Sequence, residues 1–192
     1  MATQVLSQKK VAILVADGFE QAELTEPKQA LDEAGAQTHI VSPNSNTVQG
    51  WQHYDKGDNF PVNVTLDSAS ADDYDALLLP GGVANPDQLR MNEKAVQFIQ
   101  AFFTAGKPVA AICHAPWTLI EADVVKGRAV TSWPSLKTDL KNAGAQWVDQ
   151  EVVVDNGLIT SRRPSDIPAF NRAIVEAFAA GLQEEQPLAS VS

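Results

Sequence analysis

The sequence predicts an α/β domain in which helices cover both faces of a mainly parallel sheet. Short apolar runs, typical of strands buried on both faces, alternate along the 192 residues with segments of helical spacing. This alternation indicates βαβ units, and neither a repeat nor a linker divides the chain. The length also favours one domain. We therefore expect a single doubly wound, flavodoxin-like sandwich that spans residues 1–192.

The first third of the chain opens this pattern with the apolar run VAILVA at residues 11–16, which predicts a buried strand. Residues 22–34 place their apolar side chains on one helical stripe, and a glycine follows as a typical stop. Residues 38–42 predict a second strand, which a proline ends. After a turn at residues 44–48, we expect only a short strand within residues 60–66.

The middle of the chain continues the alternation with a third apolar run, residues 76–79, which ends in Pro80-Gly81-Gly82. Residues 92–105 have the clearest helical periodicity. Residues 109–112 predict another buried strand, and residues 116–125 predict the helix that follows it.

The last third predicts three strands, a short helix and a closing amphipathic helix. The strands are expected at residues 129–132, 147–154 and 158–162, and the helices at residues 134–143 and 166–182. We expect the two ends, residues 1–8 and 184–192, to be flexible.

The composition excludes several classes of protein. Fourteen Lys and Arg against 24 Asp and Glu give a net charge of −10, which disfavours general binding to nucleic acids or anionic membranes. One Cys excludes an intramolecular disulfide, and the absence of paired ligand motifs argues against a structural zinc site. With no membrane-length apolar stretch and no apolar region at the start, we expect a cytoplasmic protein.

Cys113 is the most informative residue for function. It lies between a predicted strand and a predicted helix, with small residues two positions before and two after it. This pattern is typical of a nucleophile elbow, the tight turn that presents a reactive side chain. The nearby helix N-terminus favours a thiolate and a lowered thiol pKa. A free cysteine is also commonly a buried core residue, so the pattern leaves both interpretations open.

Other residues at the ends of predicted strands could assist such a thiol. His114 is the candidate base, although adjacent side chains point apart unless a sharp turn reunites them. Gly81 and Gly82 could let a backbone N–H approach developing negative charge, with the His114 N–H as a second donor. Glu20 follows the first strand; it is either a solvated residue or a buried, protonated partner of the sulfur.

Several motifs together resemble the ThiJ/PfpI superfamily, and most closely the PfpI branch of intracellular cysteine hydrolases. They are Gly18-Phe19-Glu20 with Glu23-Leu24, Leu78-Leu79-Pro80-Gly81-Gly82, Asn92-Glu93-Lys94-Ala95-Val96, Ala111-Ile112-Cys113-His114-Ala115-Pro116, Trp147-Val148-Asp149 and Ser161-Arg162. The resemblance covers residues 9 to 180 and implies a flavodoxin-like fold.

The resemblance also implies roles for individual residues. Cys113 would be the nucleophile and Glu20 its carboxyl partner, with Gly82 and His114 as backbone oxyanion donors. Asp87 from a neighbouring subunit would orient His114, so the resemblance implies a homo-oligomer. Trp133 and Gly81 would line the pocket. No cofactor and no metal would be needed.

Three functions remain open. The first is a cysteine-dependent hydrolase or lyase in stress protection, which acts on reactive carbonyls or glycated adducts as deglycases and glyoxalases do. The second is an intracellular cysteine peptidase, which needs the same thiol and oxyanion donors. The third is a redox-sensing stress protein or holdase, in which Cys113 is oxidised and catalysis is secondary. The expected partners are a small carbonyl compound or a peptide.

Overall fold

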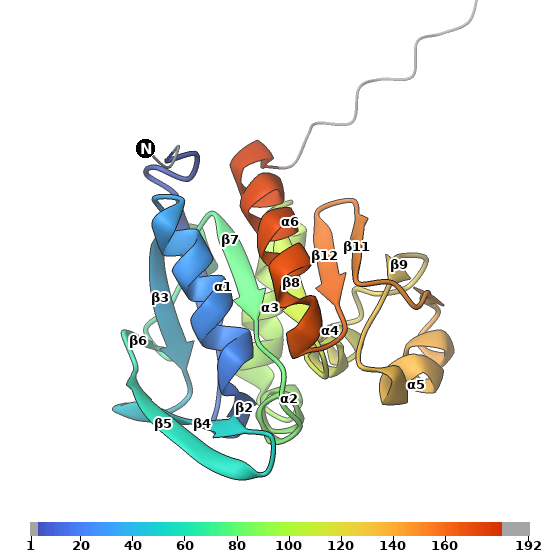
Figure 1. Cartoon of the computed structure of the whole chain (residues 1–192), viewed down its shortest axis with the longest axis horizontal. Helices are drawn as coiled ribbons and strands as arrows, with labels where there is room; N and C mark the ends of the chain where they lie inside the picture. Colours follow the sequence, from blue (N-terminus) through green and yellow to red (C-terminus); the bar gives the residue numbers. More distant parts are fainter. Residues whose placement is uncertain (1–3, 182–192) are drawn as a thin grey trace, which may run out of the picture.

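A seven-stranded sheet runs through the centre of the computed structural model, which describes residues 4–181 (Figure 1). Its order is β11-β12-β8-β7-β1-β3-β6, and every neighbouring pair is parallel except β11 and β12. The strands are β1 (Lys10–Leu14), β3 (Gln37–Ser42), β6 (Val64–Thr65), β7 (Ala76–Leu79), β8 (Val109–Ile112), β11 (Val152–Asp155) and β12 (Leu158–Ser161). The prediction of a mainly parallel sheet is confirmed.

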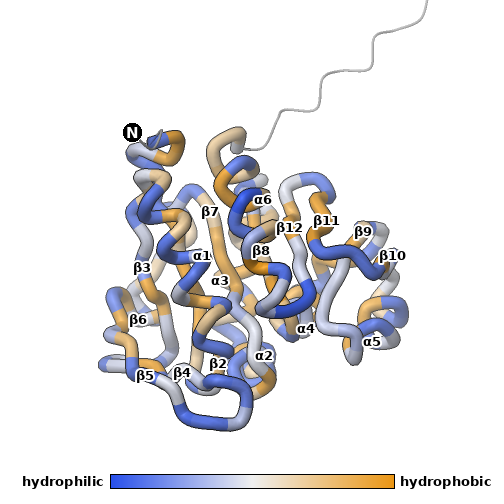
Figure 2. Tube along the Cα trace, in the orientation of Figure 1, coloured by the Kyte–Doolittle hydropathy of each residue, from blue (hydrophilic) through white to orange (hydrophobic). Residues whose placement is uncertain are grey.

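Helices cover both faces of this sheet, as the sequence predicts (Figure 1). Helices α1 (Gln21–Glu33) and α6 (Ile167–Ala180) pack together on one face, while α3 (Glu93–Thr104) and α4 (Pro116–Glu121) cover the other. Neighbouring strand residues divide between the two faces, so Ile13 packs under α1 and α6 whereas Leu14 packs with α3 and α4. Both layers bury apolar side chains, and Figure 2 shows hydrophobic residues concentrated in the central strands.

A hairpin absent from the sequence prediction adds a second, three-stranded sheet. Strands β4 (Thr47–Gln52) and β5 (Asp55–Pro61) pair antiparallel, and β4 also pairs with β2 (Phe19–Glu20). The predicted turn at residues 44–48 is shorter than expected because β4 begins at Thr47, and the short strand expected within residues 60–66 is present as β6; the hairpin itself is what the sequence prediction lacks. The hairpin escaped detection because β5 is mostly polar and exposed, without the apolar alternation that reveals a strand.

Smaller differences occur elsewhere. Helix α2 (Ala84–Arg90) was not predicted, because its sequence has few apolar residues and a proline in its first turn. The strand expected at residues 147–154 is divided into β10 (Gln146–Trp147) and β11. Strand β10 pairs with β9 (Ala129–Val130), beside α5 (Lys137–Asn142).

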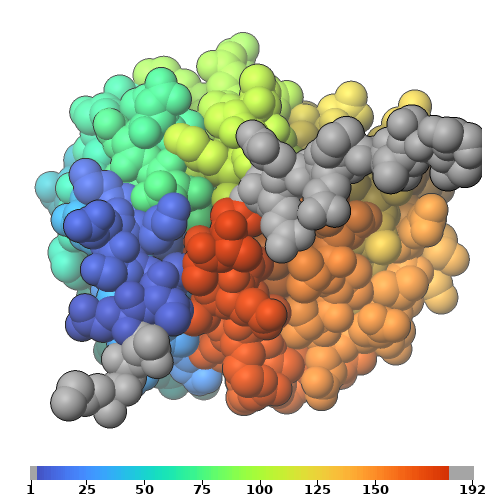
Figure 3. All heavy atoms as spheres, turned by 90° about the horizontal axis from the view of Figure 1, so that it is seen from above, coloured from blue at the N-terminus to red at the C-terminus, as the bar shows by residue number. Residues whose placement is uncertain are grey.

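The start of the described chain is fixed to the domain. Leu6 is fully buried, and its N–H donates a hydrogen bond to the Ala34 carbonyl at 2.9 Å. The expectation that residues 1–8 are flexible is therefore wrong for this part; residues 1–3 and 184–192 lie outside the described residues. Figure 3 shows the N-terminal segment beside α6. No helix within residues 4–181 has the length and apolar character that crossing a bilayer requires.

Candidate active site

Cys113 occupies a sharp turn between β8 and α4. Its φ is +65°, a left-handed conformation that is strained for a residue with a side chain. Two backbone hydrogen bonds hold it there: the Cys113 N–H donates to the Ser161 carbonyl at 3.1 Å, and the Trp133 N–H donates to the Cys113 carbonyl at 2.9 Å. The structure thus contains the strand–turn–helix arrangement that the small neighbours of Cys113 predict.

The turn brings three polar groups to the sulfur. The backbone N–H groups of Gly82 and His114 both donate hydrogen bonds to it. The imidazole of His114 also folds back, so that its Nδ1 lies 3.2 Å from the Cys113 sulfur. The obstacle to pairing adjacent side chains is therefore removed by the backbone geometry of the elbow.

The carboxyl group beside the thiol belongs to Glu23, not to the predicted Glu20. Glu23 is fully buried, its Oε2 accepts a hydrogen bond from the Gly81 N–H at 2.9 Å, and its carboxyl forms a hydrogen bond with Cys113. Glu20 instead accepts the N–H of His53 at 3.1 Å. The two residues differ in their position relative to α1. Glu20 precedes the helix and turns toward the hairpin, whereas Glu23 lies on the buried side of its first turn.

Burial controls the protonation of Glu23. Removal from water raises the pKa of this carboxyl to about 8, the nearby charge of Glu20 raises it further, and hydrogen bonds from Cys113, Gly81 and Gly82 oppose the rise. Glu23 is therefore protonated at neutral pH and can donate a hydrogen bond. Its Oε1 has no other partner of ordinary hydrogen-bond geometry within residues 4–181.

The predicted lowering of the Cys113 pKa is wrong. Burial raises this pKa well above its ordinary value, the charge and hydrogen bond of Glu23 add to the rise, and the N–H groups of Gly82 and His114 oppose it. The expected backbone field is present, but the loss of water outweighs it. Because Glu23 is protonated at neutral pH, its charge does not act on the sulfur there. The resting sulfur is a thiol.

His114 complements this neutral thiol. Burial lowers the pKa of its imidazole to about 4, so the ring is uncharged at neutral pH and can accept a proton. The ring stacks on Trp133 with 5.7 Å between centroids, and its Nε2 lies 3.5 Å from the Ser135 hydroxyl. The pair therefore rests as thiol and imidazole, ready for proton transfer during attack.

The glycine turn after β7 is shaped by close contacts. Gly82 has a φ of +74°, and a Cβ there would lie 2.5 Å from the Gly18 carbonyl oxygen. Gly81 is buried between Glu23 and Cys113 and does not line the cavity, contrary to prediction. Asn85, which sequence reasoning missed, fixes the turn, because its buried amide donates to the carbonyls of Pro80 and Gly81 at 2.9 and 3.0 Å.

A cavity of about 440 Å³ opens above the sulfur. Cys113, His114 and Glu23 contribute to its walls, and Trp133 lines it as the sequence predicts. The hairpin that was not predicted supplies further wall residues. This size suits a small molecule or one side chain better than a folded protein.

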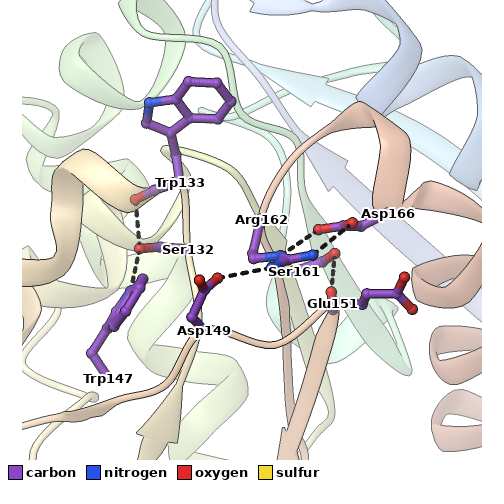
Figure 4. A network of polar contacts seen from close by, with 8 residues as sticks. All are labelled: Ser132, Trp133, Trp147, Asp149, Glu151, Ser161, Arg162 and Asp166. Atoms are coloured by element: carbon purple, nitrogen blue, oxygen red, sulfur yellow. Dashed lines mark hydrogen bonds and ion pairs between the residues drawn. The ribbon is translucent and has the colours of Figure 1, made fainter.

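A network of polar contacts supports the wall around Trp133 (Figure 4). Arg162 forms two hydrogen bonds with Asp166, at 2.7 and 3.1 Å, and one with Asp149 at 2.8 Å. The Ser132 hydroxyl donates to the Trp133 carbonyl at 2.8 Å. The Ser132 contacts support the pocket wall at Trp133, and the Arg162 contacts support the strand end next to Ser161, whose carbonyl accepts the Cys113 N–H.

Asp87 lies away from this cavity in the single chain. It is exposed on α2 and lines a separate hollow with Arg90, Met91, Glu93, Val96 and Glu121. Its action on His114 of another subunit therefore stays a prediction. Within residues 4–181, no three His, Cys, Asp or Glu side chains gather as metal ligands.

A cysteine in a strained elbow, at the strand ends of a doubly wound sheet, defines a flavodoxin-like protein with a candidate thiol site. The chain belongs to the DJ-1/PfpI family, whose sequence model matches residues 9–177. It is 44% identical over 167 residues to Deglycase PH1704 of Pyrococcus horikoshii, covering 87% of this chain and 98% of the relative.

Two further comparisons agree with this membership. General stress protein 18 of Bacillus subtilis is 47% identical over 166 residues, covering 85% of this chain and 94% of the relative. A two-domain protein of Anabaena variabilis, with DJ-1/ThiJ/PfpI-like and ferritin-like domains, superposes with a TM-score of 0.84 at 36% identity. That alignment covers 94% of this chain and 52% of the other, so this chain spans about half of the two-domain protein.

Proposed function

We propose that this chain is a cysteine-dependent enzyme of stress protection that acts on reactive carbonyls or on their adducts with amino groups. The observation that carries the proposal is the meeting of the Cys113 thiol with an uncharged His114 and two converging N–H groups. A relative named as a deglycase supports this substrate class, and a relative named as a general stress protein supports the role in stress protection.

The first chemical step is addition of the sulfur to an electrophilic carbon. The Cys113 thiol transfers its proton to Nδ1 of His114 while the sulfur–carbon bond forms. On an aldehyde, the C=O electron pair moves to oxygen, where the N–H groups of Gly82 and His114 stabilise the charge until the His114 imidazolium returns the proton to this oxygen. On a hemiaminal adduct, the carbon–nitrogen bond breaks instead, and the amine leaves with the proton from His114. Both routes give the same thiohemiacetal.

The remaining steps need no external oxidant for a 2-oxoaldehyde. Removal of the proton on the sulfur-bearing carbon and its return to the adjacent carbon convert the thiohemiacetal into a 2-hydroxyacyl thioester. One carbon is oxidised as its neighbour is reduced. Water then hydrolyses the thioester, releases the hydroxy acid and restores the thiol. Burial keeps Glu23 protonated beside the sulfur at neutral pH, so no carboxylate charge opposes the negative charge that develops there.

A peptidase would use the same groups, and the cavity volume is the observation against it. About 440 Å³ admits a side chain or a small carbonyl compound, but leaves little room for an extended peptide. The redox and holdase interpretation is separable by a simple criterion. A holdase keeps its activity in Cys113→Ser, whereas both enzyme interpretations require the thiol.

The deciding experiment compares wild type and Cys113→Ala in methylglyoxal consumption and in casein or peptide cleavage. We expect methylglyoxal consumption only by the wild type and no Cys113-dependent proteolysis. Conversion by the Ala variant at the wild-type rate would show that the nucleophile is wrongly assigned. Proteolysis without methylglyoxal turnover would establish the peptidase instead.

A further inference from the structure

The mouth of the Cys113 cavity is formed by β2 and by the tip of the β4–β5 hairpin. Glu20 pairs with Trp51 in the parallel β2–β4 register, which places the two residues side by side. The hairpin then turns through His53 and Tyr54, and all four residues line the cavity. The side chain of Glu20 is only 14% exposed, and its Oε2 accepts the His53 N–H at 3.1 Å.

The charged side chains that line this mouth are acidic. No Lys or Arg is among the lining residues, and the acidic ones are Glu20 and Glu23. Since Glu23 is protonated at neutral pH, Glu20 supplies the negative charge, which also acts on Glu23. The imidazole of His53 lies 3.8 Å from Glu20 but is mostly exposed. The guanidinium of Arg163 lies over the ring of Trp133, and Arg163 is not among the lining residues.

Trp51 differs from the other three tryptophans of the chain. Each of those three already has a cation of the same chain over its ring, at 5.2 to 5.8 Å from the centroid: Arg90 over Trp117, Arg163 over Trp133 and Lys137 over Trp147. Trp51 has no such partner in the described part of the chain, although it lies beside a carboxylate. The neighbouring Tyr54 is 94% exposed.

We propose that Glu20, Trp51 and Tyr54 form a subsite for an organic cation, specifically a guanidinium group. A planar guanidinium can stack on Trp51 while its N–H groups donate to the Glu20 carboxylate. A cation bound at the mouth would present an attached carbonyl adduct to Cys113 on the cavity floor. Only this last step rests on the proposed function, since cation binding does not require turnover.

The test measures binding without chemistry, on the full-length Cys113→Ser protein. Titration calorimetry compares Nα-acetyl-arginine amide with Nα-acetyl-citrulline amide, a neutral compound of nearly the same shape. We expect the arginine compound to bind about tenfold more tightly, as a combined ion pair and cation–π contact predicts. Glu20→Gln and Trp51→Leu, each added to this background, should reduce the preference to about twofold.

The matched control is Glu26→Gln, the same chemical change at an exposed position of α1 outside the cavity; it should leave the preference unchanged. Equal binding of the two compounds would overturn the subsite, as would a preference that survives both mouth substitutions. Thermal melts establish that each variant is folded. Methylglyoxal carries no cation, so its turnover by wild type tests the proposed function separately.

Discussion

The carboxyl of Glu23 and the side chain of Cys113 approach each other across Gly81. A Cβ at Gly81 would collide with Glu23 Oε2 and lie 2.7 Å from Cys113 Cβ. The acid and the thiol can interact only because the residue between them has no side chain.

Gly81→Ala should therefore separate the two groups. We expect a loss of ~1–3 kcal/mol in the free energy of unfolding from overpacking, and at least about a tenfold fall in kcat. Denaturant melts and methylglyoxal kinetics measure both effects. Gly127→Ala is the control for lost stability alone, because a Cβ there meets nothing within 4 Å but stands at a φ of +77°, so it should lower the free energy of unfolding without lowering kcat. Full activity in Gly81→Ala would mean that contact between Glu23 and Cys113 is unimportant.

The pH profile of kcat/KM should have limbs set by two buried groups. Activity rises as His114 loses its proton near pH 4, and falls as Glu23 ionises near pH 8 and places a charge beside the sulfur. Rates measured from pH 3.5 to 9.5 test this expectation. Glu23→Gln should remove the alkaline limb; an unaltered limb would assign it to another group.

The same substitution should change stability in a pH-dependent way. Glu23 releases its proton near pH 4.5 in the unfolded chain and near pH 8 in the folded one. The folded state therefore loses stability as pH rises through this window, and Glu23→Gln abolishes that loss. At pH 8 we expect Glu23→Gln to be ~4 kcal/mol more stable than wild type, with little difference at pH 4.5. Urea melts at both pH values provide the measurement, and equal differences at the two would contradict it.

Trp133 should act on His114 through burial. Trp133→Ala exposes the imidazole to water, so the pKa of His114 moves up toward its ordinary value and the acid limb of activity shifts upward by about one to two units. Trp133→Phe retains a stacked ring and should keep the limb near its original position. NMR titration of His114 gives the same answer independently of catalysis, and identical pKa values in the two variants would rule out this role.

Asp87 provides a test of a shared site. If Asp87 orients His114 of a neighbouring subunit, Asp87→Ala lowers kcat about tenfold or more without lowering Tm. Mixing Asp87→Ala with Cys113→Ala should then restore part of the activity, because mixed oligomers combine an intact thiol with an intact carboxylate. Glu93→Gln, in the same hollow, is the control. Absence of complementation in verified mixed oligomers would place Asp87 outside the site.

Local patterns were sufficient for the main framework and for the turn that carries Cys113. The strands that carry the site are short, apolar and buried, and small residues around Cys113 are required by the turn itself. Glu23 was missed because the same side chain occurs three residues earlier, at Glu20, which ends β2 ahead of the helix, whereas Glu23 lies on the buried side of the first turn of α1. Its position beside Leu24, on the buried stripe of α1, was the available signal.

Features that depend on tertiary contacts could not be predicted from local sequence patterns. The thiol pKa depends on how much water the fold removes, and this overrode the favourable position at a helix start. The β4–β5 hairpin gains its strand structure from pairing, since its polar sequence has no periodic apolar pattern. The stacking of Trp133 on His114 joins residues whose proximity follows from the path of the chain after β9.

The β4–β5 hairpin has a consequence for how proteins of this kind diversify. Its base is anchored by buried Val48, but its tip at His53 and Tyr54 contributes nothing to the main sheet. Substitutions at the tip can therefore accumulate with little penalty to folding, while the elbow beneath tolerates almost none. Ligand preference can therefore evolve at the mouth of the cavity without disturbing the turn that carries Cys113.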